Sequence, residues 1–283
     1  MVWFPANRSS LFLPKSIAQV VSIHDVVWKK YPETMKCTSL KLDEFFMMRS
    51  AKLADIVTTV SHSSFDDIVR GGVSDPNKVI VVSNGVNEPN PVEKKIDRSF
   101  FLFVGTLEPR KNLTRLLQAY DSLPLSIKGK MKLVIVGGKG WGEVNLPDMI
   151  TQLDLTERVE VLGCVDDTVL ATLYANAQFL VMPSLYEGFG LPLVEAMAYG
   201  TPVLTANNSS MPEVAGNAGL LIDALDVKSI ADGLQEMITN NELRERLAKN
   251  SKLNAARYSW DESAKKLIAV FEKAIDLRKD KLS

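Results

Sequence analysis

Short apolar runs alternate with segments of helical periodicity along the whole chain. Uninterrupted apolar runs are typical of strands buried on both faces, and apolar residues repeating every three or four positions are typical of the helices that cover such strands. The alternation therefore predicts an α/β fold with parallel sheets. The predicted strands are 20–23, 56–60, 79–82, 101–104, 132–136, 159–161, 178–182 and 202–205. The predicted helices are 40–53, one that opens near Ser63, 112–123, 170–177, 192–199, 226–240, 243–257 and one from 260 to about 277.

A stretch rich in proline and charge at 88–95 separates two blocks of this alternation. Such composition is typical of a linker. We predict a first domain over residues 1–93, a second over 94–258, and a C-terminal helix within 259–283 that packs back toward the first domain. The first block is short for a domain.

Charge and cysteine content narrow the function classes. The 33 Lys and Arg residues nearly balance the 34 Asp and Glu residues, so we expect no nucleic-acid partner, and a phosphate-bearing ligand must be held by a local site. Cys37 and Cys164 lack metal-type spacing, which favours a reducing, cytoplasmic location. We find no leader and no apolar run of ~20 residues, and therefore expect no transmembrane segment. The basic tail at 278–281 leaves peripheral contact with the inner membrane face open.

The most informative motif, Glu-Gly-Phe-Gly-Leu at 187–191, joins a predicted strand to a predicted helix. Gly188 and Gly190 allow close approach of the backbone or positive φ, and amides at the helix start favour an anion. Glu187 in the loop, with Glu195 predicted in the first helical turn, suits hydrogen bonds to hydroxyls of a sugar ring and a ribose. The alternative is a glycine-rich turn with a helix-capping glutamate.

A second motif follows the predicted strand 101–104. Here Gly105 is followed by Arg110 and Lys111, directly before a predicted helix. Two cations beside a helix N-terminus form a suitable diphosphate site, because arginine gives planar bidentate contact and lysine a mobile charge. The alternative is a solvated basic pair beside an Asn112 cap.

His24 closes the predicted strand 20–23 and is a candidate for binding a substrate hydroxyl or carrying a proton. A satisfied core histidine is the alternative. The acidic pairs at 66–67 and 166–167 fit solvated or capping positions better than metal ligands, so no metal site is predicted.

Together these segments resemble glycosyltransferase family 4, the retaining GT-B enzymes. The resemblance covers most of the chain and rests on 105–112, 162–163, 187–195, 200–203, 212–216, 219–221 and 259–260, with 24–25, 60–64 and 83–86 upstream. It implies a GT-B fold of two Rossmann-like doubly wound domains. The family's first domain normally opens with a strand and a glycine-rich loop that this sequence lacks. We therefore expect an incomplete first domain whose strand 20–23 lacks neighbours and exposes an apolar edge.

The resemblance also implies residue roles. Arg110 and Lys111 look like the diphosphate-binding cations beside Gly105. Glu187 resembles the glutamate that contacts the donor sugar, assisted by amides of Phe189, Gly190 and Leu191. Glu195 resembles the ribose-binding glutamate, and His24 resembles the histidine near the transferred sugar. By this resemblance His24, Glu187, Arg110 and Lys111 are the catalytic candidates.

The implied reaction is transfer of a sugar from a nucleoside-diphosphate sugar to a hydroxyl of a saccharide or lipid-linked saccharide, with retention, as in polysaccharide biosynthesis. Many relatives carry arginine after the glycine, whereas this chain has Thr106 and resembles a mannosyltransferase-like branch, so GDP-mannose is the favoured donor. No cofactor or metal is expected. Two alternatives stay open: a donor-binding remnant that is inactive or depends on a partner, and a GT-B-fold sugar-nucleotide epimerase.

Overall fold

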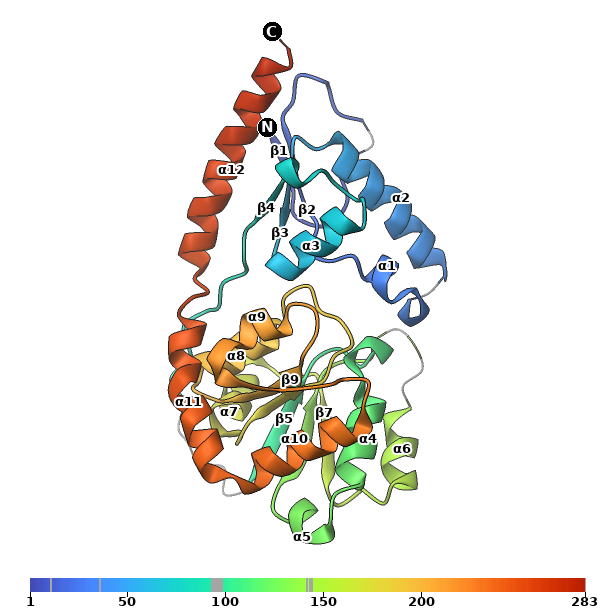
Figure 1. Cartoon of the computed structure of the whole chain (residues 1–283), viewed down its shortest axis with the longest axis vertical. Coiled ribbons are helices and arrows are strands. Elements are labelled where there is room, and N and C mark those ends of the chain that lie inside the picture. The colour runs from blue at the N-terminus through green and yellow to red at the C-terminus, as the bar shows by residue number, and fades with distance from the viewer. Residues whose placement is uncertain (11, 36, 93–98, 141, 143–144, 283) are drawn as a thin grey trace. The chain divides into compact units, whose positions relative to one another are not determined.

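The computed structural model describes residues 1–283 except 11, 36, 93–98, 141, 143–144 and 283. The described chain divides into two compact units. Unit 1 comprises 1–85, 187–189 and 258–283, and unit 2 comprises 86–186 and 190–257. Each unit holds one parallel sheet flanked by helices, which confirms the predicted α/β class (Figure 1). The domain boundary predicted at residue 93 lies outside the described residues.

Unit 1 is built on a parallel sheet in the order β1-β2-β3-β4. Its strands are β1 (Val2–Phe4), β2 (Gln19–Ser22), β3 (Ile56–Thr59) and β4 (Val79–Val81). Its helices are α1 (Val27–Lys30), α2 (Cys37–Leu53), α3 (His62–Arg70) and α12 (Trp260–Asp280), with short 3-10 turns at Pro32–Thr34 and Pro76–Lys78.

Both faces of this sheet are buried, by different helices. Neighbouring residues of a strand point to opposite faces. On one face Val21 and Val57 pack with apolar residues of α1, α2 and α3, whereas on the other Val20 and Ile56 pack with Val270 of α12. The last helix of the chain thus completes the core of unit 1, as Figure 1 shows.

Strand β2 is not an exposed edge. It pairs with β1 on one side and β3 on the other, and all four of its residues are buried. The expectation that strand 20–23 lacks neighbours is therefore wrong. The short strand β1 forms the edge instead, where Trp3 is 40% exposed and donates a 3.0 Å hydrogen bond from its ring nitrogen to the Ser22 hydroxyl.

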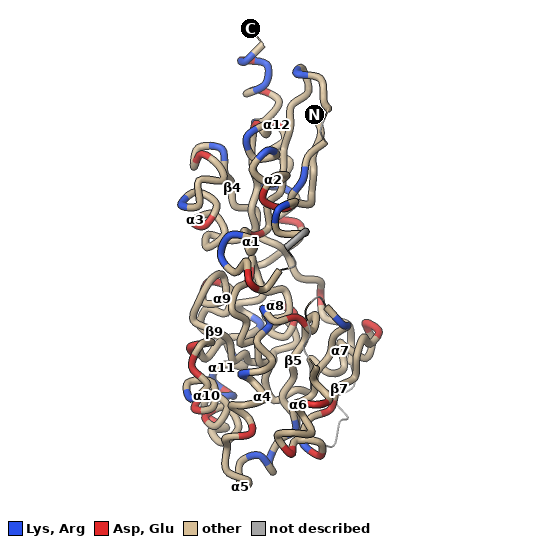
Figure 2. Tube along the Cα trace, turned by 90° about the vertical axis from the view of Figure 1, so that its right-hand side faces the viewer, with Lys and Arg blue, Asp and Glu red and all other residues tan. Residues whose placement is uncertain are grey.

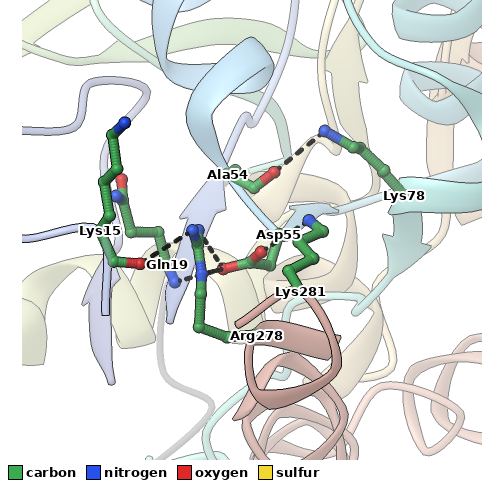
Figure 3. A network of polar contacts seen from close by, with 7 residues as sticks. All are labelled: Lys15, Gln19, Ala54, Asp55, Lys78, Arg278 and Lys281. Atoms are coloured by element: carbon green, nitrogen blue, oxygen red, sulfur yellow. Dashed lines mark hydrogen bonds and ion pairs between the residues drawn. The ribbon is translucent and has the colours of Figure 1, made fainter. Parts of the chain in front are cut away.

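A buried ionic network anchors α12 at the amino end of β3 (Figure 3). The Asp55 side chain is 0% exposed, and its oxygens accept hydrogen bonds from Arg278 at 2.7 and 3.0 Å and from Lys281 at 2.9 Å. The backbone amide of Gln19 donates to the same carboxylate at 2.9 Å. Burial opposes ionisation of Asp55, but these donors and the positive charge of Arg278 outweigh it, so the pKa of Asp55 lies below its ordinary value.

Unit 2 holds a parallel sheet in the order β10-β9-β8-β5-β6-β7. Its strands are β5 (Phe100–Val104), β6 (Lys132–Val136), β7 (Val159–Gly163), β8 (Leu180–Met182), β9 (Val203–Ala206) and β10 (Gly219–Ile222). Its helices are α4 (Leu113–Asp121), α5 (Leu125–Lys128), α6 (Leu146–Gln152), α7 (Asp167–Asn176), α8 (Leu191–Ala198), α9 (Met211–Ala215), α10 (Val227–Thr239) and α11 (Asn241–Ala255). Short 3-10 turns lie at Pro109–Lys111 and Gly216–Ala218.

Strand β5 lies inside this sheet, and later strands of the chain are added on both sides of it. Strands β6 and β7 extend the sheet on one side, and β8, β9 and β10 extend it on the other. In the core, the Phe101 ring stacks on Phe179 at 5.0 Å and meets the edge of Tyr120 at 5.2 Å. In open sheets of this kind, ligands bind outside the carboxyl ends of the strands where the strand order reverses. That point lies between β5 and β8.

Charge and apolar length complete the picture of the surface. Cationic and anionic positions are interspersed along the trace of both units (Figure 2). Over the described part of the chain, no helix combines the length and apolar character needed to cross a membrane.

Candidate functional site

Two strand-to-helix turns of unit 2 meet at the point where the strand order reverses. The turn after β5 carries the Arg-Lys pair, and the turn after β8 leads into the Glu-Gly-Phe-Gly-Leu segment. The amide of Leu185 donates to the carbonyl of Arg110 at 2.8 Å. The side-chain amide of Asn112 donates to the carbonyls of Pro183 at 3.0 Å and Ala224 at 2.7 Å. The fold thus brings the two motifs together and fixes one turn against the other.

The Arg-Lys pair is ordered by the fold, not solvated. The Arg110 guanidinium donates to the carbonyl of Tyr186 at 2.5 Å and to a Glu108 carboxylate oxygen at 2.6 Å. Lys111 is 8% exposed, and its side chain runs beside Gly105, where an added Cβ would lie 3.5 Å from the lysine Cε. The interpretation as a solvated basic pair is therefore wrong, since both cations are held in place at the carboxyl edge of the sheet.

Asn112 also differs from the predicted cap. It occupies the N-cap position of α4 with φ 62°, but its side chain makes no capping hydrogen bond. Its amide group instead joins the turn after β5 to two other segments, as described above. A left-handed backbone conformation is tolerated best by glycine and asparagine, and here asparagine adds the bridging donor.

The start of α8 has the geometry expected of an anion-binding turn. Gly190 is the N-cap residue with φ 97°, a conformation that side chains disfavour, and no side chain caps the helix. Leu191 is the first helical residue, and no acidic residue lies in the first turn. Glu195 is the fifth helical residue, one position beyond the first turn in which we expected it.

Glu195 has a protein partner that the motif does not contain. The hydroxyl of Tyr174, on α7, donates to Oε2 of Glu195 at 2.7 Å. Burial, together with the neighbouring Glu195 carboxylate, raises the pKa of Tyr174 well above its ordinary value. The tyrosine therefore stays protonated and acts as the donor in this pair.

Unit 1 holds the remaining predicted site residues. The Nε2 atom of His24 lies 2.7 Å from the carbonyl of Pro5, and its backbone amide donates to Oδ1 of Asn7 at 3.0 Å. Since a carbonyl only accepts, Nε2 must carry the hydrogen, which in the neutral ring leaves Nδ1 as an acceptor. His24 is half-buried, so the core-histidine alternative does not describe it.

The segment 187–189 is grouped with unit 1. Glu187 is 7% exposed, and the Phe189 ring meets the edge of Tyr258 at 5.2 Å. The carbonyl of Gly188 accepts hydrogen bonds from Ser61 at 2.7 Å and Ser64 at 3.1 Å. An added Cβ at residue 188 would lie 2.4 Å from the backbone oxygen of His24, so only glycine fits there. Unit 1 thus holds the segment 187–189 next to the backbone of His24.

Three residues of this region, Glu108, Asn112 and Tyr174, make side-chain contacts that the sequence pattern does not predict. Glu108 and Asn112 stand inside the predicted motif, and their position beside the cations is the signal that could have drawn attention to them. Tyr174 is remote in sequence from Glu195, so only the fold reveals it. In the described ranges, no three His, Cys, Asp or Glu side chains gather as a group able to hold a metal ion.

Known proteins resemble the chain along most of its length. The O-antigen chain mannosyltransferase B of Escherichia coli is 30% identical over 276 residues, which cover 93% of this chain and 72% of that protein. The MMP alpha-(1->4)-mannosyltransferase of Mycolicibacterium hassiacum is 32% identical over 256 residues, covering 88% of this chain and 58% of that protein. The O-antigen chain mannosyltransferase RfbU of Salmonella typhimurium is 31% identical over 243 residues, covering 86% of this chain and 66% of that protein.

Solved structures share the fold. HepE of Anabaena, in complex with UDP and glucose, superposes with a TM-score of 0.77 at 22% identity, covering 90% of this chain and 72% of that one. Sucrose-phosphate synthase of Thermosynechococcus elongatus superposes with a TM-score of 0.77 at 23% identity, covering 90% and 67%. The fold is therefore of the GT-B type. The family model for glycosyl transferases group 1 matches residues 86–254, and the chain belongs to this family of glycosyltransferases.

Proposed function

We propose that this glycosyltransferase moves a mannosyl residue from GDP-mannose to a hydroxyl of a glycan or lipid-linked saccharide, with retention of the anomeric configuration. One observation carries the proposal. Two cations lie where the strand order of unit 2 reverses, hydrogen bonds fix their turn against the turn after β8, and the chain leads from that second turn to the uncapped start of α8. This is the position and the charge that a nucleoside diphosphate requires.

In this proposal the diphosphate lies against Arg110 and Lys111 and the start of α8. Arginine offers two parallel donors and lysine a point charge, so together they take the part that a divalent cation plays in other sites. Glu195 accepts hydrogen bonds from the ribose hydroxyls, and Glu187 accepts them from hydroxyls of the donor sugar. A phosphate alone would be repelled by two carboxylates, whereas a sugar nucleotide offers hydroxyls to both.

Catalysis is then mainly electrostatic. The bond between the anomeric carbon and the diphosphate oxygen breaks and the diphosphate leaves with the electron pair. The acceptor oxygen bonds to the anomeric carbon, and its proton passes to the leaving diphosphate. Negative charge develops on the leaving group, and Arg110 and Lys111 stabilise it in fixed positions. His24 contributes at the transferred sugar, with Nδ1 as the acceptor of a hydroxyl hydrogen.

The choice of mannose rests on relatives. Three relatives whose names state mannosyl transfer align with most of this chain. The names of two of them also state an O-antigen chain, which supports a growing saccharide as acceptor. The GT-B neighbour HepE holds UDP and glucose, which supports a nucleotide-sugar donor and makes UDP-sugars the competing ligands in a test.

Isothermal titration of the purified chain tests the donor site. GDP-mannose, UDP-glucose and UDP-N-acetylglucosamine are compared with the wild type and with the Glu195→Ala and Lys111→Ala variants. We expect GDP-mannose to bind most tightly and each variant to lose about ten- to a hundredfold in affinity, as for a charge-assisted hydrogen bond. Lys132→Ala and Glu157→Ala are matched controls, because both side chains are exposed and lie at the amino ends of the strands, away from the site. Lys132 is the first residue of β6, and Glu157 precedes β7.

The outcomes separate the three functions. Binding followed by formation of a mannoside when an acceptor saccharide is added supports transfer, and the configuration of the product by NMR tests retention. Binding without turnover identifies a donor-binding remnant. Formation of the 2-epimer without any acceptor identifies an epimerase. A folded wild-type chain that binds none of the three donors contradicts the proposal.

A further inference from the structure

We propose that Tyr174 is a positioning residue of the nucleotide site, which holds Glu195 in the orientation that reads the ribose hydroxyls. The inference rests on the proposed function, since it assigns a supporting group to the carboxylate that we place at the ribose. Tyr174 comes from α7, outside both motifs of the site.

The geometry gives the two oxygens of the Glu195 carboxylate different environments. Oε2 accepts a 2.7 Å hydrogen bond from the Tyr174 hydroxyl, and within the described residues Oε1 accepts none. Glu195 is half-buried, so part of its side chain is accessible. One oxygen is thus anchored to the protein and the other is available to a ligand.

Tyr174 is itself held rigidly. Its side chain is buried, and its ring stacks on Tyr199 at 6.0 Å with 17° between the planes. The Tyr199 hydroxyl accepts a 3.1 Å hydrogen bond from the amide of Asn90, and the Tyr174 carbonyl accepts one from the Thr201 hydroxyl at 2.6 Å. A buried donor whose ring is stacked and whose backbone is hydrogen-bonded can orient its acceptor, which an exposed and mobile tyrosine could not do.

The Tyr174 hydroxyl is a hydrogen-bond donor in its protonated form. Burial and the adjacent carboxylate hold the pKa of Tyr174 well above 10.0, so the group remains a donor. Without it, a glutamate side chain has to be ordered by the ligand, at a cost in rotamer freedom. Loss of the hydroxyl should therefore weaken nucleotide binding and, above all, reduce the preference for a nucleotide with both ribose hydroxyls.

The experiment compares nucleotides that differ by one ribose hydroxyl. The wild-type chain is titrated with GDP and UDP, and the one that binds more tightly is compared with its 2′-deoxy and 3′-deoxy analogues. In the wild type we expect at least one missing hydroxyl to reduce affinity about tenfold. In Tyr174→Phe we expect the intact nucleotide to bind about five- to tenfold less tightly and the ratio between intact and deoxy nucleotide to fall toward one.

Tyr120→Phe is the matched control. Tyr120 is also a buried tyrosine of unit 2, and its hydroxyl donates to the carbonyl of Met131 at 2.6 Å, but it lies on α4 in the core. This variant should lower the melting temperature and leave the ratio of affinities at its wild-type value. The ratio is the decisive readout, because a tyrosine that merely stabilises the fold does not change it.

The outcomes distinguish the inference from the function on which it rests. If Tyr174→Phe keeps the wild-type ratio while Glu195→Gln loses it, Tyr174 does not position the glutamate and the inference fails alone. If Glu195→Gln also keeps the ratio, the ribose assignment fails and the inference falls with it. If the wild type binds neither GDP nor UDP, the proposed function fails first.

Discussion

Among the described residues, one cluster in each unit joins an arginine to a buried carboxylate, and the two clusters lie at opposite ends of their sheets. In unit 1, Asp55 stands at the amino end of β3 and meets Arg278 and Lys281 of the last helix region. In unit 2, Glu108 and Arg110 stand in the turn that follows the carboxyl end of β5. The first cluster joins segments remote in sequence, and the second lies within one turn.

The difference teaches how to tell an anchor from a binding site. In the Asp55 cluster, Arg278, Lys281 and the Gln19 amide all donate to one carboxylate, and Arg278 also donates to the carbonyl of Lys15 at 3.2 Å, so the last helix is fixed to the sheet. In the second, Arg110 donates both to Glu108 and to the carbonyl of Tyr186, in the turn that follows β8, so the cation itself is positioned. Only the second lies at the edge where parallel sheets of this kind bind ligands. The same pair of residue types thus stabilises a fold in one place and serves a site in the other.

The largest expected effect comes from breaking the unit 1 cluster. Arg278→Ala removes two hydrogen bonds from a carboxylate that has no exposure to solvent, and we expect a loss of about 3 kcal/mol in the free energy of unfolding of unit 1. Urea denaturation followed by circular dichroism measures it. Lys279→Ala is the control, because its ion pair with Asp276 is exposed on both sides and should contribute under about 1 kcal/mol. Equal midpoints for the two variants would contradict an anchoring function.

The same cluster predicts a pH dependence. The folded pKa of Asp55 lies below its ordinary value of 3.8, so its stabilisation is fully present above about pH 4 and is lost as the pH falls through the folded pKa. The stability difference between wild type and Arg278→Ala should therefore shrink in acid. A difference that stays constant down to pH 2 would mean that packing, not charge, sets the effect.

The second largest effect is expected in unit 2, at the asparagine that joins the turns of the site. Asn112→Gly keeps a residue that tolerates φ 62° but removes the donor to two carbonyls, and we expect unit 2 to lose about 2 kcal/mol in free energy of unfolding. Asp154→Gly serves as control, because Asp154 has φ 52° in the same unit and an exposed side chain. Its stability should stay near that of the wild type. If both variants behave alike, the asparagine bridge is not what joins the turns.

The smallest effect is on binding alone. Arg110→Lys keeps the charge but cannot hold Glu108 and the Tyr186 carbonyl together, and we expect about a tenfold loss in affinity for GDP-mannose with little change in stability. Arg278→Lys is the counterpart in the other cluster and should lower stability while leaving that affinity unchanged. Titration and denaturation of the two variants side by side test the contrast. It fails if both arginines affect the same property.

The sequence predicts the interior strands of the fold well. The strand 132–136 is observed with the same ends, because a continuous branched apolar run buried on both faces carries a strong signal. The pattern does not predict β1 or β10, which are edge strands. β1 has three residues, one of them an exposed tryptophan, and β10 begins with glycine and leaves Leu221 partly exposed. Such short runs give a weaker apolar signal than the five-residue strand 132–136, whereas the pattern does predict the edge strands β4 and β7.

In the candidate site, residues within local motifs could be predicted from the sequence, whereas partners from distant segments could not. Arg110, Lys111, Gly190 and Glu195 stand in local motifs, and the fold puts their turns at the reversal of strand order. Tyr174 and the Asp55 partners come from segments far away in the chain, and nothing in a local pattern links them. Asp226 caps α10, since its side chain accepts from the Lys228 amide, whereas the cap predicted at Asn112 does not form, because tertiary carbonyls compete for its side chain.

The position of α12 on the first sheet has a consequence for how the chain is made. Val20 and Ile56 emerge early from the ribosome, but Val270 and Ala274, which cover them, follow only after all of unit 2. One face of the sheet of unit 1 therefore stays exposed to solvent until all the strands of unit 2 have been synthesised. The core of unit 1 is therefore completed only after unit 2 has been synthesised, and until then its apolar strand residues are exposed to aggregation.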